Sequence, residues 1–442
     1  MSDSQTPNPA PAPLTGTILD YAGHSEEARS AADPNAKPYK EGRAAEHARG
    51  VQWIGPWESP DDGFAGHTRA SVRALSAAGL QVQLRGLSPR QDVEEQVVDS
   101  VRDLLTKSIA KYEVRVVQIV PNLDVVSRWV LHPRLDAQEA AGRNAATILY
   151  TVWERENMDR NLVALMSLAG QLWTACSRSA KALVAAGAPA DKVHVVPMPY
   201  TATDPFAAMA PRRRPGGPLR FLHIGKWEPR KGQDQLIHAF MLAFRPGEAE
   251  FIIKTSKQAP EFVGYAKNPT AAVQAALRDP RVAANGWTDA TVSPSIRMIR
   301  DRLSDTQIVA LHSWADVYCT ASHGEGFDMP AFASALARNR LVYTPCGGPE
   351  DFCNDADVLV QNCGSESCHP WYEWEENSTW TSVATDDVAE ALREAARRGR
   401  GPVTRSLSSG FSAIGVGRKM RQLIEQQAQT FGVRFNGDGS GT

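Results

Sequence analysis

Cysteine, long apolar runs and an excess of charge of one sign are all scarce in this 442-residue sequence. Its 48 Lys and Arg against 50 Asp and Glu leave a formal net charge of −2, which argues against bulk electrostatic capture of nucleic acid or of an anionic membrane. The longest mostly apolar stretch, Leu162–Cys176, is broken by Ser167 and Gly170 and is too short to span a bilayer. We therefore expect a protein with no transmembrane segment and no nucleic-acid partner.

The few cysteines are unevenly placed, because five of the six lie between positions 319 and 368. From Cys346 onward they are spaced by 7, 10 and 5 positions, which does not fit the paired C-x-x-C pattern of a zinc site. We expect reduced structural thiols, and a metal site or a disulfide is the less favoured alternative.

The two ends of the chain differ in composition from its middle. The N-terminus, MSDSQTPNPAPAPLTG, lacks the basic and apolar regions of a secretory signal, and its Pro, Ser and Thr content predicts a disordered leader over residues 1–50. Residues 431–442 are predicted to form a disordered tail. These features favour a cytoplasmic location.

From residue 51 to residue 210, short apolar runs alternate with helical stretches, which is typical of a parallel α/β sheet. The run VQWIGPW predicts a first buried strand, and a glycine-bearing loop, a helix with Val72 and Leu75 on one face, and a second strand follow it. Further strands are predicted at 114–120, 146–152, 172–175 and 193–196. Residues 51–210 are thus expected to form an N-terminal α/β domain.

The segment PRRRPGGP, residues 211–218, joins Pro and Gly breakers to a basic run, and we interpret it as an interdomain linker. A solvated connector is favoured there over phosphate or lipid binding. A second α/β series follows over residues 219–408, with a strand predicted at 283–286 and a helix at 305–314. A C-terminal helix within residues 409–430 closes the fold and could pack back on the first domain.

The first informative motif is HIGKWEPRKG, residues 223–232. A strand delivers Gly225 and Lys226 to a turn, and Lys231 to the start of the next helix. Two ammonium groups beside helix-terminal N–H donors favour an anion and would suit a diphosphate. On these residues alone, surface lysines in a turn are an equally good interpretation.

The second motif, ASHGEGFDMPAFASAL, covers residues 321–336 and lies between a predicted strand and a predicted helix. The helix should begin at about Met329, with Asp328 able to cap it. Glu325 then lies at the carboxyl end of a strand, where ligands bind in open α/β sheets, and a carboxylate beside helix N–H groups suits sugar hydroxyls and phosphate together. The alternative is a plain loop with a solvated Glu325.

Together the two motifs resemble a known family. GKWEPRKGQDQLIHAF is similar to the G-R-L-x-x-x-K-G-x-x-x-L-I-x-A-F segment of family-four retaining glycosyltransferases (glycosyl transferases group 1), and ASHGEGFDMPAFASALA is similar to their E-G-F-G-L-P-x-x-E-A-M-A segment. The likeness covers about residues 51–430 and is stronger in the second half. It implies an α/β protein of the GT-B type, in which two Rossmann-like α/β domains face each other across a cleft. Residues 51–210 would then form the domain on the acceptor side, and residues 219–408 would bind the nucleotide sugar.

The resemblance also implies roles for individual residues. Lys231 corresponds to the lysine that binds the diphosphate, and Glu325 to a glutamate that contacts the hydroxyls of the donor sugar; both are expected to be catalytic. The second glutamate of the family pattern is absent, because its position is Ala333. Lys226 stands where the family usually has arginine, which keeps the charge and loses the bidentate fork. The full set of implied donor-binding residues is Gly66, Gly225, Lys226, Lys231, Gly326, Phe327, Asp328 and Met329, with loop N–H donors expected at Gly66 and near Met329.

A further departure from the family lies in ILYTVWERE, residues 148–156. Many relatives carry histidine at the position of Trp153, and here the nearest ionisable group is Glu154. The stretch is similar to a Y-T-x-W-E variant in some members, so that Glu154 would face the cleft as a catalytic residue and orient the acceptor hydroxyl. A buried ion pair of Glu154 with Arg155 or Arg178 is an equally good interpretation.

The activity that the resemblance implies is a hexosyltransferase-type, retaining transfer of a sugar from a nucleotide diphosphate sugar to the hydroxyl of a carbohydrate, lipid-linked or small-molecule acceptor, as in polysaccharide biosynthesis. The nucleotide sugar is a co-substrate, and no cofactor and no metal are expected, because the lysines already supply positive charge. A lipid acceptor would add peripheral membrane contact. The alternatives are a catalytically impaired nucleotide-sugar-binding module, since Ala333 and Trp153 replace two expected groups, and another GT-B enzyme such as a nucleotide-sugar epimerase.

Overall fold

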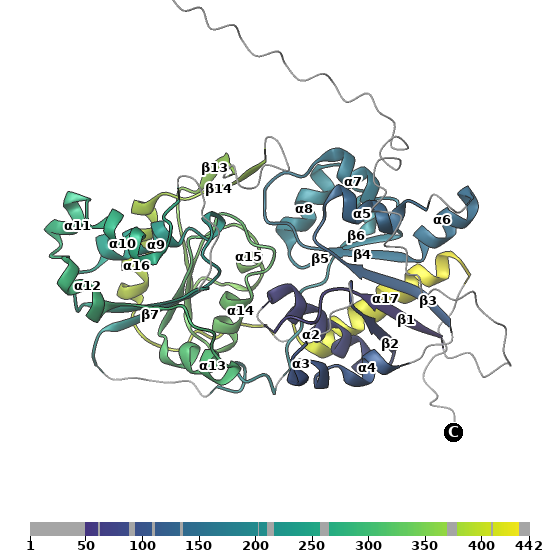
Figure 1. Cartoon of the computed structure of the whole chain (residues 1–442), viewed down its shortest axis with the longest axis horizontal. Helices are drawn as coiled ribbons and strands as arrows, with labels where there is room; N and C mark the ends of the chain where they lie inside the picture. Colours follow the sequence, from purple (N-terminus) through teal and green to yellow (C-terminus); the bar gives the residue numbers. More distant parts are fainter. Residues whose placement is uncertain are drawn as a thin grey trace, which may run out of the picture.

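The computed structural model describes residues 49–60, 62–87, 93–107, 111–132, 136–201, 203–209, 216–256, 265–368, 378–407 and 410–432. The predicted leader up to residue 48, residues 211–215 of the predicted linker and residues 433–442 of the predicted tail lie outside them. The chain forms two lobes side by side, each built on a parallel sheet (Figure 1).

The N-terminal lobe contains six parallel strands in the order β2-β1-β3-β4-β5-β6. The central strand β4 is buried along its whole length, as expected of a strand covered by helices on both faces. Three large aromatic side chains, Trp53, Tyr150 and Trp173, pack together in its core. The elements are β1 (Arg49–Ile54), α2 (Gly63–Ala77), β2 (Gln81–Arg85), α3 (Glu95–Asp99), α4 (Arg102–Thr106), β3 (Lys111–Gln118), α5 (Leu123–Val130), α6 (Ala137–Ala145), β4 (Thr147–Thr151), α7 (Arg160–Met166), β5 (Gln171–Thr174), α8 (Ser177–Ala185), the short 3₁₀ helix η2 (Ala190–Lys192) and β6 (Val193–Val195).

The C-terminal lobe repeats this plan with the strand order β12-β11-β10-β7-β8-β9. A two-stranded antiparallel hairpin, β13 and β14, is added to it. The elements are β7 (Leu219–Ile224), the 3₁₀ helix η3 (Pro229–Lys231), α9 (Gln233–Ala243), β8 (Ala249–Lys254), α10 (Pro269–Ala276), α11 (Pro280–Ala284), α12 (Asp289–Ser295), β9 (Ile296–Ile299), α13 (Asp305–Trp314), β10 (Val317–Cys319), α14 (Met329–Leu336), β11 (Arg340–Tyr343), α15 (Pro349–Phe352), β12 (Val358–Leu359), β13 (Gly364–Ser367), β14 (Thr379–Ser382) and α16 (Thr385–Arg398).

The strand predicted at 283–286 is wrong, because this segment belongs to helix α11 and the turn after it. Asp279 caps that helix by accepting from the N–H of Arg281, and Pro280 at its first turn has the backbone angle that a helix needs. The edge strand is β9 instead, which pairs with β8.

The last helix, α17 (Ala413–Thr430), leaves the C-terminal lobe and lies across the N-terminal one beside α2 (Figure 1). Its apolar face, with Met420 and Ile424, joins the core of that lobe. A Cβ on Gly417 would lie 2.3 Å from the carbonyl oxygen of Ala74, so the glycine lets the two helices approach closely. Arg421 and Gln427 donate hydrogen bonds to carbonyl groups of the N-terminal lobe.

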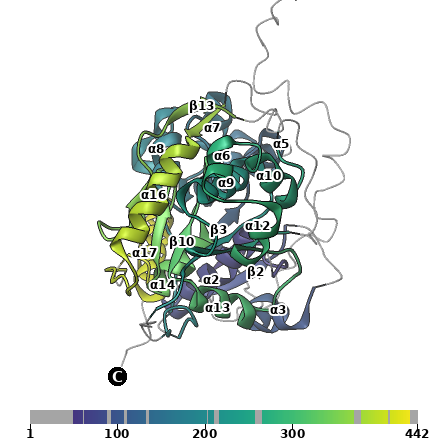
Figure 2. The ribbon, with the colours of Figure 1, turned by 90° about the vertical axis from the view of Figure 1, so that its left-hand side faces the viewer.

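The hairpin β13–β14 lies at the upper edge of the C-terminal lobe in Figure 1, on the side toward the N-terminal lobe, and β13 is again at the top in Figure 2. It contacts the segment after β4: the N–H of Glu156 donates to the carbonyl of Thr379 (2.9 Å), and Ser365 donates to the Glu156 carboxylate. The hairpin therefore ties the C-terminal lobe to the N-terminal one beside the predicted cleft.

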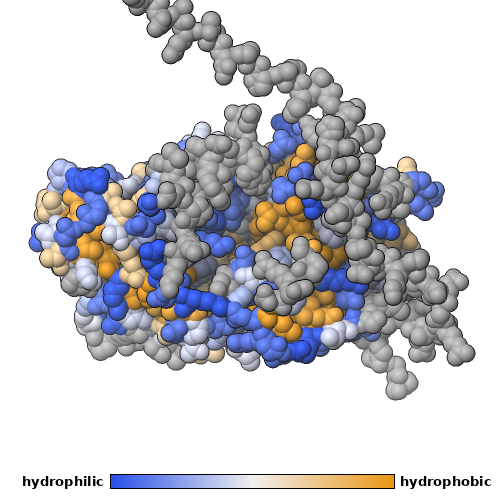
Figure 3. Space-filling model, in the orientation of Figure 1, coloured by the Kyte–Doolittle hydropathy of each residue, from blue (hydrophilic) through white to orange (hydrophobic). Residues whose placement is uncertain are grey.

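The visible face of the protein mixes hydrophilic and hydrophobic residues over both lobes (Figure 3). Among the described residues, no helix combines the length and the apolar character needed to cross a membrane.

Candidate active site

The loops after β1 and β4 of the N-terminal lobe meet the loops after β7 and β10 of the C-terminal lobe. Two glycines after β10 lie against the N-terminal lobe: a Cβ on Gly324 would lie 1.8 Å from the carbonyl oxygen of Glu154. A Cβ on Gly326 would lie 2.7 Å from Cβ of Val152. The two positions therefore accept only a residue without a side chain. The loop between β10 and α14, residues 320–328, carries predicted donor-binding residues and is called the donor loop below; it passes directly against the N-terminal lobe.

The turn after β7 carries the predicted diphosphate-binding lysine. Gly225 continues the sheet, because its N–H donates to the carbonyl of Lys254 (3.0 Å). The turn ends at Gly232, which has a positive φ of 57° and whose Cβ would lie 2.3 Å from the carbonyl oxygen of Ala321. Only glycine meets both demands, and it brings Lys231, immediately before it, against the loop after β10.

Lys231 and Glu325, both predicted as catalytic residues, are in direct contact. The Lys231 Nζ lies 2.6 Å from Oε1 and 2.8 Å from Oε2 of Glu325, whose side chain is only 3% exposed. Burial by itself raises the pKa of Glu325, but Lys231 and Arg230 outweigh it and hold the pKa at about 2. Burial lowers the pKa of Lys231, and Glu325 more than reverses this, so the pair is charged at neutral pH.

Asp328 caps helix α14 as predicted, since its side chain accepts from the N–H of Ala331 (3.1 Å). Its backbone is left-handed, with φ of 61°, a conformation that aspartate adopts more readily than most residues. The carboxyl is 6% exposed, and burial together with repulsion from Glu325 raises its pKa to about 7. Asp328 is therefore a buried carboxyl that titrates near neutral pH beside the ion pair.

Phe327 directs its ring into the core of the C-terminal lobe, against Phe332 and Phe352 (5.1 and 5.7 Å between ring centroids). The carbonyl oxygen of Phe327 lies 2.0 Å from where a Cβ on Gly348 would be. The glycine-containing loop after β11 therefore packs directly against the main chain of the donor loop. The side chain of Phe327 is thus structural, and a contact with the donor would have to come from its main chain.

Gly66 does not provide a loop N–H donor, contrary to the prediction. Helix α2 begins at Gly63, because Asp62 caps it by accepting from the N–H groups of Phe64 and Ala65. Gly66 lies inside this helix and donates to the carbonyl of Asp62 (3.0 Å). Its lack of a side chain has another use: a Cβ there would lie 3.2 Å from Cε of Met329, which packs over this helix end from the other lobe.

Lys226 lies in a different environment from Lys231. Its side chain is 67% exposed, and Nζ is 3.6 Å from the Asp62 carboxylate of the N-terminal lobe. The two lysines predicted as a cationic pair thus differ in burial and in partner, and each is matched with a carboxylate.

Glu154 faces the other lobe and pairs with a residue that the sequence did not suggest. Its Oε2 lies 3.1 Å from Nε of Arg230. The alternative pairing is wrong: Arg155 donates to Ser378 and stacks over Trp153, and Arg178 binds Glu156 (3.0 Å) and Glu350. Desolvation raises the pKa of Glu154, and Arg230 opposes this rise.

Arg230 and His67 are the site residues that sequence reasoning missed. Arg230 stands directly before Lys231 in the first motif, which was the available signal. His67 is 3% exposed and lies 2.6 Å from the hydroxyl of Tyr150, which donates in turn to the carbonyl of Val196. Burial lowers the pKa of His67 to about 3, so it is neutral at physiological pH and its Nε2–H donates to the tyrosine.

Trp153, at the position where relatives carry histidine, is buried in the N-terminal core and donates from Nε1 to the carbonyl of Asn157 (2.9 Å). Trp287, which follows α11, is likewise buried and donates to the carbonyl of Phe244. Both indole rings therefore serve packing.

The cysteines form no disulfide, and burial raises the pKa of the Cys319, Cys346 and Cys353 thiols. No group of three or more potential metal ligands occurs in the described part of the chain. A D-x-D spacing, which in other proteins can hold a divalent metal ion, occurs at Asp355 and Asp357. Asp357 is fully buried against Arg405 and accepts from the N–H of Leu341, so it holds the lobe together.

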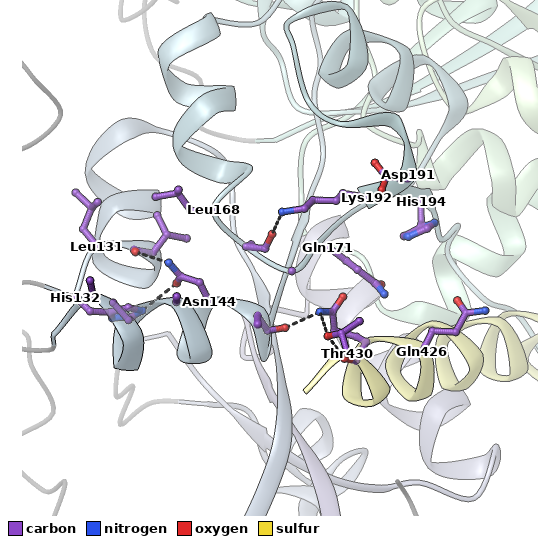
Figure 4. A pocket seen from close by; sticks show the side chains of 18 residues that line it. Leu131, His132, Asn144, Leu168, Gln171, Asp191, Lys192, His194, Gln426 and Thr430 are labelled. Atoms are coloured by element: carbon purple, nitrogen blue, oxygen red, sulfur yellow. Dashed lines mark hydrogen bonds between the residues drawn. The ribbon is translucent and has the colours of Figure 1, made fainter. Parts of the chain in front are cut away.

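A cavity of about 820 Å³ lies at the amino ends of β4, β5 and β6, at the opposite edge of the sheet from the loops described above (Figure 4). Its polar side chains largely bind the main chain or one another: Lys192 donates to the carbonyls of Ser167 and Ala169, and His132 contacts Asn144. The cavity is thus separate from the candidate active site.

No known protein-family model matches the sequence, and no curated protein is significantly similar to it. Solved structures do resemble the fold. One is Anabaena Alr3699/HepE, in a complex with UDP and glucose, which is 12% identical with a TM-score of 0.47 and covers 86% of this chain and 100% of its own.

Two other solved structures superpose with a TM-score of 0.51 at 11% identity. They are the lipopolysaccharide outer core galactosyltransferase WaaB, covering 87% of this chain and 98% of its own, and trehalose-6-phosphate synthase OtsA, covering 86% and 98%. The likeness extends over both lobes, each with its parallel six-stranded sheet. The chain therefore has the GT-B fold, in which two α/β domains face each other.

Proposed function

We propose that the protein is a retaining glycosyltransferase, which moves a sugar from a nucleotide diphosphate sugar to an acceptor hydroxyl. The observation that carries the proposal is the Lys231–Glu325 pair. It brings a buried cation and a buried carboxylate, predicted separately from two motifs about 90 positions apart, to within 2.6 Å of each other. This contact lies at the carboxyl edge of the sheet, where α/β proteins bind ligands.

The chemistry of the pair suits both halves of a nucleotide sugar. An ammonium has three N–H donors, and Lys231 already uses two of them for the two carboxylate oxygens of Glu325. A diphosphate oxygen would accept from the third donor or displace the carboxylate. A carboxylate accepts hydrogen bonds, and with its pKa held at about 2 Glu325 stays ionised to accept from sugar hydroxyls. Lys226, exposed across from Asp62, would add a second cation near the phosphates.

Departure of the diphosphate is the difficult part of the proposed reaction, because negative charge grows on the leaving group while the sugar carbon becomes oxocarbenium-like. Lys231, Lys226 and main-chain donors near Met329 would stabilise that charge, and one preorganised donor is typically worth roughly 3–4 kcal/mol. The departing phosphate could take the proton of the incoming hydroxyl, which Glu154 would orient from the N-terminal lobe. In this proposal the lysines carry the role of a metal, so that neither a metal nor a cofactor takes part.

The shared fold supports the same class of reaction, since WaaB is named a galactosyltransferase and OtsA a trehalose-6-phosphate synthase. We propose a hexosyl donor, a carbohydrate, lipid-linked or small-molecule acceptor and a cytoplasmic location. A role in polysaccharide biosynthesis is one use of such a transfer.

One observation favours a second candidate, a module that binds a nucleotide sugar without turnover. Trp153 replaces the histidine of many relatives and is buried with its N–H bound to Asn157, so it offers no polar group to the cleft. Ala333, on α14, replaces the second glutamate of the family pattern. A nucleotide-sugar epimerase would use the same donor site with a different outcome.

The test is a panel of UDP-, GDP- and ADP-sugars, with release of the nucleoside diphosphate measured in the presence of sugar acceptors, and with EDTA in parallel. We expect one donor to be turned over, EDTA to have no effect, and Lys231→Ala to abolish at least 99% of the rate. Lys181→Ala, an exposed lysine on α8, is the control and should retain full activity. Binding of a donor without turnover would favour the binding module, and a product with inverted anomeric configuration by NMR would exclude the retaining reaction.

A further inference from the structure

Arg230 occupies the centre of the contact between the two lobes. Arg230 is 8% exposed, although it lies in the short 3₁₀ helix η3 rather than in a strand or an α-helix. A buried guanidinium is stable only when its donors are used. The directions in which these donors point indicate what the residue does.

The guanidinium reaches three separate segments of the chain. Nη2 lies 2.6 Å from the Glu228 carboxylate in its own turn, and Nη1 lies 3.3 Å from Oε2 of Glu325 in the donor loop. Nη1 also donates to the carbonyl of Gly324. The remaining donor, Nε, lies 3.1 Å from Oε2 of Glu154 in the N-terminal lobe. One planar group therefore holds carboxylates from both sides of the cleft.

This arrangement differs from that of Lys231, which among these carboxylates is paired only with Glu325. It also requires arginine, because a planar fork with five N–H donors can serve three directions at fixed angles, whereas an ammonium is a point charge on a flexible stem. Arg230 further anchors the donor loop through its main chain, since its carbonyl accepts from the N–H of His323 (2.7 Å).

We propose that Arg230 is a positioning residue that sets Glu325 and Glu154 relative to each other, and so aligns the donor sugar with the acceptor hydroxyl across the cleft. This rests on the proposed glycosyltransferase function. The Arg230–Glu154 contact joins the two lobes, so the alignment is complete only when they are together as in this structure. Donor binding through Lys231 does not need the contact, whereas transfer does.

The proposal separates binding from turnover. In Arg230→Gln, the affinity for the free nucleoside diphosphate, measured by calorimetry with UDP, GDP and ADP, should change less than threefold. The kcat for transfer should fall about 100-fold, the loss expected for a misplacement of about 1 Å. Arg230→Lys should recover only part of the loss, because the charge returns without the fork.

The pH profile gives a second readout that a merely structural residue would not move. Glu154 is faced by Arg230 and Lys231, which favour its ionised form, and by Glu325 and Glu228, which disfavour it. Removal of the guanidinium should raise the pKa of Glu154, so the acidic limb of the kcat profile should move to higher pH in Arg230→Gln. In Glu154→Gln the acidic limb should be absent, or it should stay at the same pH when Arg230→Gln is added.

The decisive experiment is a double-mutant cycle of Arg230→Gln and Glu154→Gln in the full chain, read in kcat. If the two residues act as a unit, the double variant loses no more than the worse single variant. The matched control is Arg178→Gln, another arginine that bridges the lobes, through Glu350 and the carbonyl of Pro345. It should lower the midpoint of thermal unfolding while keeping kcat within threefold and the pH profile unchanged.

Strictly additive losses in the cycle, or equal losses of kcat in Arg178→Gln and Arg230→Gln, would overturn the positioning role while the wild-type activity leaves the proposed function standing. A wild-type protein that turns over no donor overturns the proposed function itself, and the positioning role with it. The thermal midpoint shows whether a variant is unfolded. If Arg230→Gln is unfolded, the kcat of Arg230→Lys tests the positioning role instead: partial recovery supports it, and full wild-type activity contradicts it.

Discussion

The close approach of Gly324 to the N-terminal lobe can be tested by the substitution Gly324→Ala. The new Cβ would lie 1.8 Å from the carbonyl oxygen and 2.7 Å from the carbonyl carbon of Glu154. Since contacts of a Cβ below 3.0 Å essentially do not occur, the two main chains must separate by about 1.2 Å. The backbone of Gly324 is not in the left-handed region, so this collision is the only obstacle to alanine.

The displacement acts directly on the candidate active site. Glu325 is the next residue along the chain, and its contact with Lys231 is only 2.6 Å long. A misplacement of about 1 Å typically costs about 100-fold in rate, and overpacking of a rigid contact costs about 1–3 kcal/mol of stability. We expect kcat/KM for release of the nucleoside diphosphate to fall about 100-fold and the midpoint of thermal unfolding to decrease.

A matched control uses the same substitution where the structure leaves space. Gly142 lies within helix α6 and has no atom within 4 Å of its Cβ position, so Gly142→Ala should add roughly 0.5–1 kcal/mol of stability and leave kcat/KM unchanged. If Gly324→Ala keeps both kcat/KM within twofold and the wild-type midpoint, the two lobes are not pressed together in the working protein. A loss of activity with an unchanged midpoint and a larger radius of gyration in small-angle scattering would mean that the lobes open to admit the methyl group.

Two further predictions concern Asp328 and Gly417. The pKa of Asp328 is raised to about 7, so between about pH 4 and pH 7 the folded protein holds a proton that the unfolded chain has lost, and stability falls as the pH rises. Asp328→Asn keeps the cap without this proton. In urea unfolding, its free energy of unfolding should exceed that of the wild type by an amount that grows from pH 5 to pH 8, to at most roughly 4 kcal/mol. A difference that is the same at every pH would contradict the raised pKa of Asp328. In Gly417→Ala the Cβ would lie 2.3 Å from the carbonyl oxygen of Ala74, so α17 should be displaced and the thermal midpoint should fall by the equivalent of about 1–3 kcal/mol. Calorimetry with whichever of UDP, GDP and ADP binds the wild type should give the same affinity for the variant, because the proposed nucleotide site is in the other lobe. A Gly417→Ala protein as stable as the wild type would show that α17 is not held by this contact.

The alternation of apolar runs and helical stretches predicted most strands of both sheets, because a buried parallel strand needs a continuous apolar run whatever surrounds it. It failed at residues 283–286, where the short apolar run lies in a helix that Asp279 and Pro280 start. The same pattern did not predict β9, Ile296–Ile299. A polar residue interrupts its apolar run, which is typical of a strand at the edge of a sheet. The GT-B arrangement was accessible through the two motifs, and the neighbouring structures confirm the fold.

The site was predictable to the extent that its residues lie in local motifs. Lys231, Glu325 and the capping role of Asp328 follow from a strand, a turn and a helix start that are each encoded within about ten residues. Gly66 was placed in a loop because the cap at Asp62, which starts the helix earlier, was not recognised. The partner of Glu154 could not be found locally, since Arg155 and Arg178 were near in the chain while Arg230 is near only in space.

Periodicity, caps and turns act over one or two turns of chain, so they were enough to predict the elements and the two-domain plan. The resemblance of the two motifs to a known family supplied the central cation and carboxylate, whereas the partners of these groups are set by contacts between segments that are far apart in the chain. Lys231 points to Glu325 because the turn at Gly232 packs against the loop after β10 within the C-terminal lobe. Glu154 meets Arg230 because the backbones of the two lobes approach each other at Gly324. Contacts of that kind depend on distance in space, which no local pattern of residues encodes.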